Sequence, residues 1–366
     1  MGLRLDSYRT LGRSGLRVSP LCLGAMTFGT DWGFGCDEAE TVSLLDAYLG
    51  AGGNFIDTAN IYTKGHAEVL LGNHFAECGG RDRVVLATKF GGNLFSGDPN
   101  AGGASRKAVL QQLEHSAIEA SLRRLRTDYV DLYWLHFDDP HTPLDETLRV
   151  LDDLVSSGKV RYLGVSDTPA WKVAQAQTAA LLRDRAGFVA LQIEYSLVER
   201  SVEHELLPMA RDLGLGVTPW SPLRGGLLSG KYGRGRLPDQ GRHKPGASKS
   251  LTERNFAIIE ALEAVAAEAG TGMARAAIAW LLARPGVCSP ILGARTLAQL
   301  QDNLGALEVV LSPDQIDRLD AASAPAPHFP QSFLANTAAI LQGGTEINGR
   351  PAPLWPLAPK TDGERW

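Results

Sequence analysis

Residues 129–166 read YVDLYWLHFDDPHTPLDETLRVLDDLVSSGKVRYLGVS. This stretch opens and closes on short apolar runs rich in Val, Leu and Tyr, which is typical of β-strands. Between them, residues 143–157 repeat apolar positions at the three- and four-residue spacing of an amphipathic helix. Two strands joined by a helical crossover form a parallel βαβ unit. We therefore expect a parallel sheet whose strands are covered by helices.

The same alternation continues along most of the chain. Apolar runs that predict strands lie at 18–24, 54–57, 83–89, 129–136, 160–166, 187–193, 215–220 and 287–292. Patterns that predict helices lie at 38–51, 66–77, 105–126, 143–157, 170–183, 201–213, 252–284 (as two helices) and 296–305. Eight strands with helical crossovers predict an α/β fold, a single (β/α)8 TIM barrel. A doubly wound dinucleotide-binding sheet fits less well, because GFGCDE at 33–38 lacks the third glycine of its phosphate loop.

The C-terminal part of the chain departs from this alternation. We assign residues 1–323 to the barrel and residues 324–366 to an extra C-terminal segment rich in Pro and aromatic residues. Prolines restrict the unfolded chain and so reduce the entropy that is lost on docking. Phe329 and Phe333 lie among these prolines. We therefore expect part of the segment to pack near the active-site mouth and to shape the substrate pocket.

The composition excludes several classes of partner. The chain has 366 residues, is 44% hydrophobic, and carries a net charge of −5 without a basic tract, so we expect no nucleic-acid or membrane-surface partner. No apolar run reaches the roughly 18 residues that a membrane span needs, and we expect a cytoplasmic protein. The four cysteines form no CxxC pair and indicate free thiols of a reducing compartment. Nothing in the sequence predicts the oligomeric state.

Polar residues follow the predicted strands at the positions where a barrel places its chemistry. Catalytic side chains of a (β/α)8 barrel lie at the C-terminal ends of the strands. Asp57, Lys89 and His136 occupy three of these ends, and Tyr62 follows Asp57 by five residues. Each residue alone is more often a cap or a structural group. Buried Asp, Lys and His side chains are rare unless they are paired, so we expect the set to form one network.

Such a network is suited to donating a proton. A tyrosine titrates near pH 10, and we expect the ammonium of Lys89 to lower the pKa of Tyr62. Asp57 would keep Lys89 charged, and His136 would orient the reacting oxygen or relay a proton. The set therefore suits protonation of a carbonyl oxygen while a hydride reaches the carbonyl carbon.

Two loops carry the features of a phosphate site. Barrel enzymes often bind phosphate with the loops after strands 7 and 8 and with a helix N-terminus. Residues 221–226 and 293–296 occupy these loops, and their glycines let the backbone approach a ligand closely. The planar donor fork of Arg295 suits a phosphate group, such as the 2′-phosphate of a dinucleotide.

Seven segments of the chain resemble the aldo-keto reductases. They are GGNFIDTANIYTKGHAEVLLG (52–72), VVLATKF (84–90), DYVDLYWLH (128–136), GKVRYLGVSD (158–167), LQIEYSL (191–197), VTPWSPLRGGLLSGKY (217–232) and ILGARTLAQLQDNLGA (291–306). The resemblance extends from about residue 8 to 323 and is closest to the bacterial branch related to potassium-channel β subunits. Agreement over seven spaced segments is highly specific, whereas the DxxxxY spacing alone would be weak.

The resemblance implies an NADP(H)-dependent oxidoreductase that reduces aldehyde or ketone carbonyls to alcohols. Tyr62 would be the general acid, with Asp57, Lys89 and His136 around it. The resemblance also implies a cofactor site. Its residues would be Ser166, Asp167 and Gln192 at the nicotinamide carboxamide, Trp220 stacked on the nicotinamide ring, Ser221, Pro222, Leu223, Gly225 and Lys231 after strand 7, Gly293, Arg295 and Gln299 after strand 8, and Asp302 and Asn303 near the adenine.

Three other functions remain open at this point. A redox-sensing NADPH-binding regulatory protein, as the channel β subunits are thought to be, would carry Asn where this chain has His136, so the enzyme is favoured. A keto-sugar reductase of a biosynthetic pathway belongs to the same branch, and nothing in the sequence selects the substrate. A metal-dependent hydrolase could use HFDDPH at 136–141, but Pro140 and Pro143 indicate a turn and a helix start there, and we expect no metal.

One further motif resembles the phosphate loop of nucleotide triphosphate-binding proteins. GGLLSGK at 225–231 matches the GxxxxGK phosphate-loop pattern. Tyr232 stands where that motif needs the Ser or Thr that binds Mg²⁺. We therefore interpret the segment as part of the cofactor loop after strand 7.

Overall fold

Eight parallel strands form the centre of the molecule. A computed structural model describes residues 2–110, 117–238 and 249–365. The strand order of the sheet is β10-β3-β4-β5-β6-β7-β8-β9, and a parallel bridge between Val217 and Val287 joins β9 to the segment leading into β10. The strands are β3 (Cys22–Gly24), β4 (Phe55–Asp57), β5 (Val85–Phe90), β6 (Val130–Leu135), β7 (Val160–Ser166), β8 (Phe188–Glu194), β9 (Gly216–Trp220) and β10 (Ile291–Gly293). The prediction of a (β/α)8 TIM barrel is confirmed.

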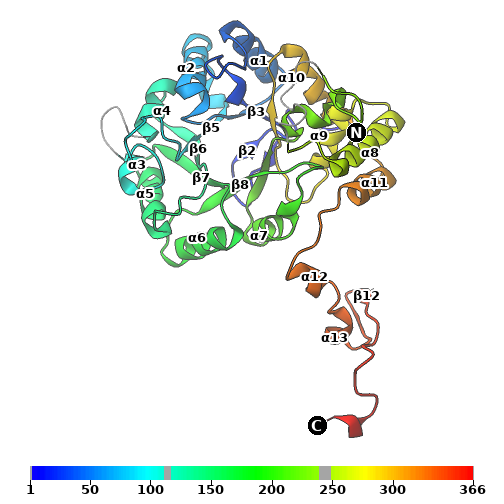
Figure 1. Cartoon of the computed structure of the whole chain (residues 1–366). Helices are drawn as coiled ribbons and strands as arrows, with labels where there is room; N and C mark the ends of the chain where they lie inside the picture. The colour runs from blue at the N-terminus through cyan, green and yellow to red at the C-terminus, as the bar shows by residue number, and fades with distance from the viewer. Residues whose placement is uncertain (1, 111–116, 239–248, 366) are drawn as a thin grey trace. The chain divides into compact units, whose positions relative to one another are not determined.

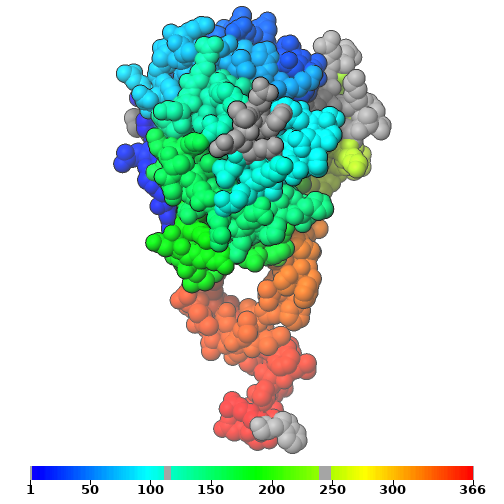
Figure 2. All heavy atoms as spheres, turned by 90° about the vertical axis from the view of Figure 1, so that its left-hand side faces the viewer, coloured from blue at the N-terminus to red at the C-terminus, as the bar shows by residue number. Residues whose placement is uncertain are grey.

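Helices surround the strands in a ring (Figure 1). They are α1 (Glu38–Gly50), α2 (His66–Cys78), α3 (Arg106–Leu110), α4 (Ala117–Leu125), α5 (Leu144–Ser156), α6 (Ala170–Leu182), α7 (Leu206–Leu213), α8 (Glu253–Glu268), α9 (Met273–Leu282), α10 (Leu297–Leu304) and α11 (Pro313–Ser323). Figure 2 shows all heavy atoms from the side on which α3 to α6 lie in Figure 1. The predicted helix over 105–126 corresponds to α3 and α4, and the six residues between these two helices lie outside the described residues.

The first predicted strand, 18–24, is divided in the structure. Its start belongs to a short strand β2 (Arg17–Val18), which pairs antiparallel with β1 (Arg9–Thr10). Pro20 has no N–H to donate to a sheet ladder. Ser19 instead donates its backbone N–H to Oδ1 of Asn54 at 2.8 Å. The barrel strand therefore begins only at β3.

Apolar side chains fill the interior of the barrel. An apolar cluster of Leu11, Val18, Cys22, Phe55, Val85, Ala87, Leu132, Trp134, Ala190 and Ile291 lies inside the sheet. Trp134 is fully buried, and a Cβ on Gly164 of the neighbouring strand would lie 2.2 Å from its ring. Any side chain at position 164 would overlap with the indole, so glycine is required there.

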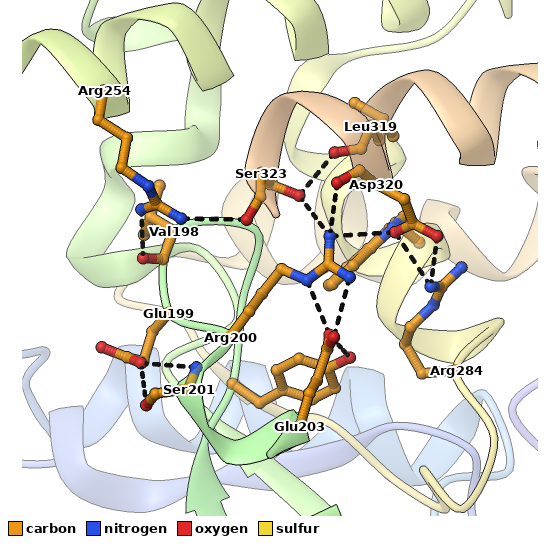
Figure 3. A network of polar contacts seen from close by, with 12 residues as sticks. Val198, Glu199, Arg200, Ser201, Glu203, Arg254, Arg284, Leu319, Asp320 and Ser323 are labelled. Carbon is orange, nitrogen blue, oxygen red and sulfur yellow. Dashed lines mark hydrogen bonds and ion pairs between the residues drawn. The ribbon is translucent and has the colours of Figure 1, made fainter. Parts of the chain in front are cut away.

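Helix α11 was not predicted from the sequence. A buried arginine, Arg200, donates from Nη1 to the Asp320 carbonyl at 3.0 Å and to Ser323 Oγ at 2.8 Å (Figure 3). Arg284 adds an ion pair with Asp320 at 2.8 Å. These charged contacts with distant segments fix the helix together with the buried Leu319, and such contacts have no signature in the local sequence.

Residues 324–366 form a compact unit separate from residues 1–323. The unit contains α12 (Gln331–Leu334), α13 (Ala338–Gln342) and a two-stranded ribbon of β11 (Glu346–Ile347) and β12 (Arg350–Pro351). The expectation that this segment packs near the active-site mouth stays a prediction.

Candidate active site

Lys89 is the centre of a buried polar network at the C-terminal ends of the strands. Its Nζ forms a short ion pair with Oδ2 of Asp57 and donates to the Thr58 carbonyl at 2.9 Å and to the Tyr62 hydroxyl at 3.0 Å. These bonds use all three donors of the ammonium. Lys89 is 0% and Asp57 2% exposed. A buried lysine with this set of partners keeps its charge.

Tyr62 reaches the network from a strained turn. Thr63 and Lys64 directly after it adopt left-handed backbone conformations, with φ of 46° and 61°. Such conformations are costly for residues other than glycine and persist only when neighbouring contacts hold them. Thr63 Oγ1 supplies such contacts, because it donates to the Phe28 carbonyl at 2.8 Å and accepts the Ala67 N–H at 2.9 Å. The turn therefore holds the phenol in place.

His136 lies on the same rim, directly after β6. Its ring centroid is 5.8 Å from that of Tyr62, with the ring planes at 79°. Among the described residues, its Nδ1 has no hydrogen-bond partner although the atom is buried. Burial, together with the charge of Lys89, lowers the pKa of His136 from 6.5 to about 3. The imidazole is therefore neutral near pH 7 and adds no second positive charge to the site.

The pKa of Tyr62 differs from the expectation. Burial raises the pKa of Tyr62 above its ordinary value, and this effect outweighs the lowering caused by the Lys89 ammonium. Burial would lower the pKa of Lys89, but the charges of Asp57 and Tyr62 raise it. The predicted lowering of the Tyr62 pKa is therefore wrong as a net effect, because the cost of burying a phenolate is larger. Tyr62 holds its proton at neutral pH and can act only as an acid there.

The strand ends beside this network hold the predicted nicotinamide residues. Gln192 donates from Nε2 to Asp57 Oδ1 at 3.0 Å, so its amide nitrogen is engaged within the network. Ser166 pairs with Gln192 across the sheet, and its Oγ is buried without a hydrogen-bond partner in the described part of the chain. Trp220 donates from Nε1 to Asp167 Oδ1 at 3.1 Å. Ser166, Gln192 and Trp220 therefore lie on three adjacent strands, Asp167 directly follows the first of them, and Ser166 presents an unsatisfied hydroxyl.

The loop after β9 has an unusual backbone. Ser221, Arg224, Gly225 and Gly226 all have positive φ, at 56°, 48°, 61° and 91°. Two N–H groups of this run are bound within the loop, because Arg224 donates to the Ser221 carbonyl at 2.8 Å and Gly226 donates to the Leu223 carbonyl at 3.0 Å. The loop continues into a π-helical turn that ends at the exposed Lys231. Pro222 in the loop is buried, and Leu223 is half-buried.

The loop after β10 differs from the expected phosphate site. Gly293 and Arg295 are exposed there, but several backbone donors are already occupied. The Leu297 N–H donates to Glu40 Oε1 at 2.5 Å, and the Arg295 N–H donates to Gln299 Oε1 at 2.9 Å. These two backbone N–H groups are therefore bound within the chain. The guanidinium of Arg295 remains the exposed cationic group of this loop, and its role in binding a phosphate stays a prediction.

The remaining predicted cofactor residues lie along α10. Asp302 forms an ion pair with Arg275 at 2.8 Å, and Asn303 is 6% exposed. Sequence reasoning did not identify Glu40, which approaches this region from α1, or the Thr58 carbonyl at Lys89. Neither residue leaves a motif, because each acts only through a contact with a distant part of the chain.

The polar residues of the HFDDPH segment form contacts of a turn. Asp138 binds Lys172, with Nζ 2.7 Å from Oδ2. Asp139 accepts the His141 N–H at 2.9 Å and the Thr142 hydroxyl at 2.7 Å. Within residues 2–110, 117–238 and 249–365, no three His, Cys, Asp or Glu side chains gather in a way that could hold a metal ion.

The low pKa of His136 predicts a pH dependence of stability. An unfolded histidine binds a proton near pH 6.5, but the folded one does so only at about pH 3. Between these values the unfolded state holds more protons, so His136 makes the free energy of unfolding fall as the pH falls. His136→Asn should remove up to about 1.4 kcal/mol per pH unit of this dependence. Urea unfolding between pH 6.5 and 4.5 measures the slope.

The exposed His141→Asn serves as the control and should leave the slope unchanged. Equal slopes for the wild type and His136→Asn would show that His136 is protonated normally in the folded protein.

Comparison with known proteins relates these features to a family. The family model described as "Aldo/keto reductase family" matches residues 20–324. An uncharacterized oxidoreductase of Bacillus subtilis, YrpG, is 40% identical over 89% of this chain and 99% of its own length. A probable voltage-gated potassium channel subunit beta of rice (Oryza sativa subsp. japonica) is 38% identical over 89% of this chain and 99% of its length. An aryl-alcohol dehydrogenase [NADP(+)] of Phanerodontia chrysosporium is 37% identical over 87% of this chain and 86% of its length.

Two further observations concern membrane-spanning helices and disulfide bonds. Among the described residues, no helix is both long and apolar enough to cross a membrane. The four cysteines are unpaired, with Cys22 and Cys36 buried, Cys288 half-buried and Cys78 exposed.

Proposed function

The chain belongs to the aldo/keto reductase family and is an oxidoreductase, and on this premise we propose that it reduces aldehyde or ketone carbonyls to alcohols with NADPH. The observation that carries the proposal is the hydrogen bond of 3.0 Å from Lys89 Nζ to the Tyr62 hydroxyl. We propose Tyr62 as the general acid, with Asp57, Lys89 and His136 as its partners.

The direction of this hydrogen bond decides which proton is available. A phenol has one hydrogen and can also accept a hydrogen bond on its oxygen. Because Lys89 donates to that oxygen, the phenolic hydrogen of Tyr62 is left for another acceptor, such as a substrate carbonyl. After the proton has left, the ammonium lies beside the phenolate and stabilises its charge.

Asp57 and His136 have different roles in the proposed reaction. Asp57 binds Lys89 on one oxygen and Gln192 on the other, which fixes the ammonium beneath Tyr62. His136 is neutral near pH 7, so it can form a hydrogen bond to the substrate oxygen without competing as a charged acid. Proton donation thus remains with Tyr62.

The residues present fit a bound nicotinamide cofactor. When bound, NADPH supplies the hydride that reduces the carbonyl carbon. The unsatisfied hydroxyl of Ser166 and the amide of Gln192 would hold the carboxamide, with Asp167 and Trp220 beside them. The remaining predicted residues would hold the phosphates and the adenosine: Ser221, Pro222, Leu223, Gly225, Lys231, Gly293, Arg295, Gln299, Asp302 and Asn303.

Arg295 is the residue that we propose to select NADPH over NADH. The carboxylate of Glu40 already occupies the Leu297 N–H at the start of α10. A 2′-phosphate at this point therefore needs a cation that can offset the carboxylate, and Arg295 lies exposed in the same loop. The NADP(+) in the name of the fungal relative supports the same choice.

Arg295→Ala tests the choice of cofactor. We expect NADPH binding to weaken by about 1.5–3 kcal/mol, the range for hydrogen bonds to charged groups, with NADH affinity almost unchanged. Titration calorimetry with both cofactors measures the difference. Arg318→Ala, which removes an exposed arginine from α11, is the matched control. An equal loss for both cofactors would argue against a contact with the 2′-phosphate.

Turnover distinguishes the proposed enzyme from a regulatory protein that only holds the cofactor. The plant relatives named as channel subunits keep this alternative open. A panel of aryl aldehydes, quinones, methylglyoxal and keto-sugars, followed by the loss of NADPH absorbance, tests the proposal. Tight NADPH binding without reduction of any member would favour the regulatory function.

A further inference from the structure

Five rings follow one another along the rim, with Tyr62 in the middle. The ring centroids of Phe34 and Trp32 are 5.9 Å apart, and those of Trp32 and Tyr62 are 6.3 Å apart with the ring planes at 76°. On the other side of Tyr62, the ring centroid of His136 is 5.8 Å from that of Tyr62 and 5.0 Å from that of Phe137. Trp32 and Phe137 are 37% and 40% exposed. The proposed acid is thus bordered on both sides by aromatic surface that solvent still reaches.

Trp32 lies in a closed loop between β3 and α1. The loop spans residues 28–36, and its base is closed by hydrogen bonds from the Gly29 N–H to the Cys36 carbonyl at 2.9 Å and from the Cys36 N–H to the Thr27 carbonyl at 2.8 Å. The base is therefore fixed, whereas the exposed indole needs a separate contact to hold it against Tyr62.

A hydrogen bond between Asp31 and His66 provides this contact. Asp31 Oδ2, next to Trp32 in the chain, lies 2.7 Å from Nδ1 of His66, the first residue of α2. His66 directly follows the short turn 62–65 that carries the tyrosine. A Cβ on Gly29 would lie 3.0–3.1 Å from Asp31 and His66, so the two segments are closely packed here. The loop is thus attached to the segment that carries the acid, both at its base, through Thr63, and near its tip, through Asp31.

We propose that Asp31 and His66 are positioning residues that hold Trp32 beside Tyr62, and that the indole selects flat aryl carbonyls over saturated ones of the same size. The proposal rests on the reductase function proposed above. Aromatic rings attract one another in edge-to-face and offset arrangements at centroid distances of about 4.5–7 Å. A puckered saturated ring has no π face and cannot form these contacts.

A matched pair of substrates tests the selection. Benzaldehyde and cyclohexanecarbaldehyde both carry a six-membered ring on the aldehyde. For each variant, kcat/KM for benzaldehyde is divided by kcat/KM for cyclohexanecarbaldehyde, and this aryl preference is compared with that of the wild type. The comparison removes the difference in intrinsic reactivity between the two aldehydes. Trp32→Leu should lower the aryl preference about three- to tenfold, chiefly through KM. Trp171→Leu, at an exposed tryptophan on α6, is the control and should leave the ratio unchanged.

A double-mutant cycle tests the contact between Asp31 and His66. Asp31→Ala should lower the aryl preference by at most about fivefold, because polar contacts between exposed side chains are weak. In the Trp32→Leu background the same change should have no further effect, since the indole that it positions is gone. Glu38→Ala, in the first turn of α1, is the carboxylate control. Additive effects of Asp31→Ala and Trp32→Leu, or an unchanged ratio in Trp32→Leu, would overturn the proposal.

Binding without turnover separates this proposal from the reductase function. Benzamide and cyclohexanecarboxamide, bound to the NADPH-loaded protein and measured by calorimetry, probe the rings without being reduced. Tighter binding of benzamide that is lost in Trp32→Leu supports the proposal even if no aldehyde is reduced, in which case only the reductase function fails. Equal affinity of the wild type for both amides would overturn it.

Discussion

Replacing Tyr62 by Phe should lower kcat for carbonyl reduction by at least about a hundredfold, the size of a general-acid contribution. The substitution removes only the hydroxyl, so the ring keeps its edge contacts with Trp32 and His136. Burial holds the Tyr62 proton in place at neutral pH, and no other described hydroxyl accepts a hydrogen bond from Lys89. Stopped-flow measurement of NADPH oxidation gives the rate of the chemical step.

The affinity for NADPH is the control for this variant and should change little. Tyr8→Phe, at an exposed tyrosine far along the chain from the network, should keep the full rate. Turnover of Tyr62→Phe near the wild-type value would contradict the assignment of the acid. It would leave the family membership and the fold untouched.

Removing the charge of Lys89 should have the largest effect on stability. Lys89→Met leaves the carboxylate of Asp57 buried without its cation, and such a loss typically costs about 3–5 kcal/mol of unfolding free energy. Activity should be lost as well, because the Tyr62 hydroxyl loses its hydrogen-bond donor. Urea unfolding monitored by circular dichroism measures the stability of the variant.

The double variant Asp57→Asn with Lys89→Met separates stability from catalysis. Without the carboxylate, no unpaired charge is buried, so a large part of the lost stability should return. The activity should stay absent, because no ammonium is left beside Tyr62. If the double variant were as unstable as Lys89→Met alone, the penalty would come from packing and the unpaired charge would not explain it.

Local patterns sufficed for the barrel and for most of its strand positions. Strand and helix periods depend on neighbours a few residues apart, and these remain together in any fold. The placement of Asp57, Lys89 and His136 at one rim followed from the same patterns, because parallel strands end on the same side. The seven segments that resemble a family added the expected roles, which remain predictions to be tested by the variants above.

Properties that depend on contacts between distant segments were decided only by the tertiary structure. The pKa of Tyr62 rises because the fold partly buries the phenol at the rim, and the extent of burial has no signature in the sequence. Glu40 reaches the start of α10 across more than 250 residues of chain, and Arg200 fixes α11 across more than a hundred. The pair of Asp31 and His66 likewise joins the loop after β3 to the start of α2 only once β3 and β4 lie side by side. Amino-acid spacing reflects only the neighbours of a residue along the chain. Protonation, burial and hydrogen bonding depend on its neighbours in the folded structure.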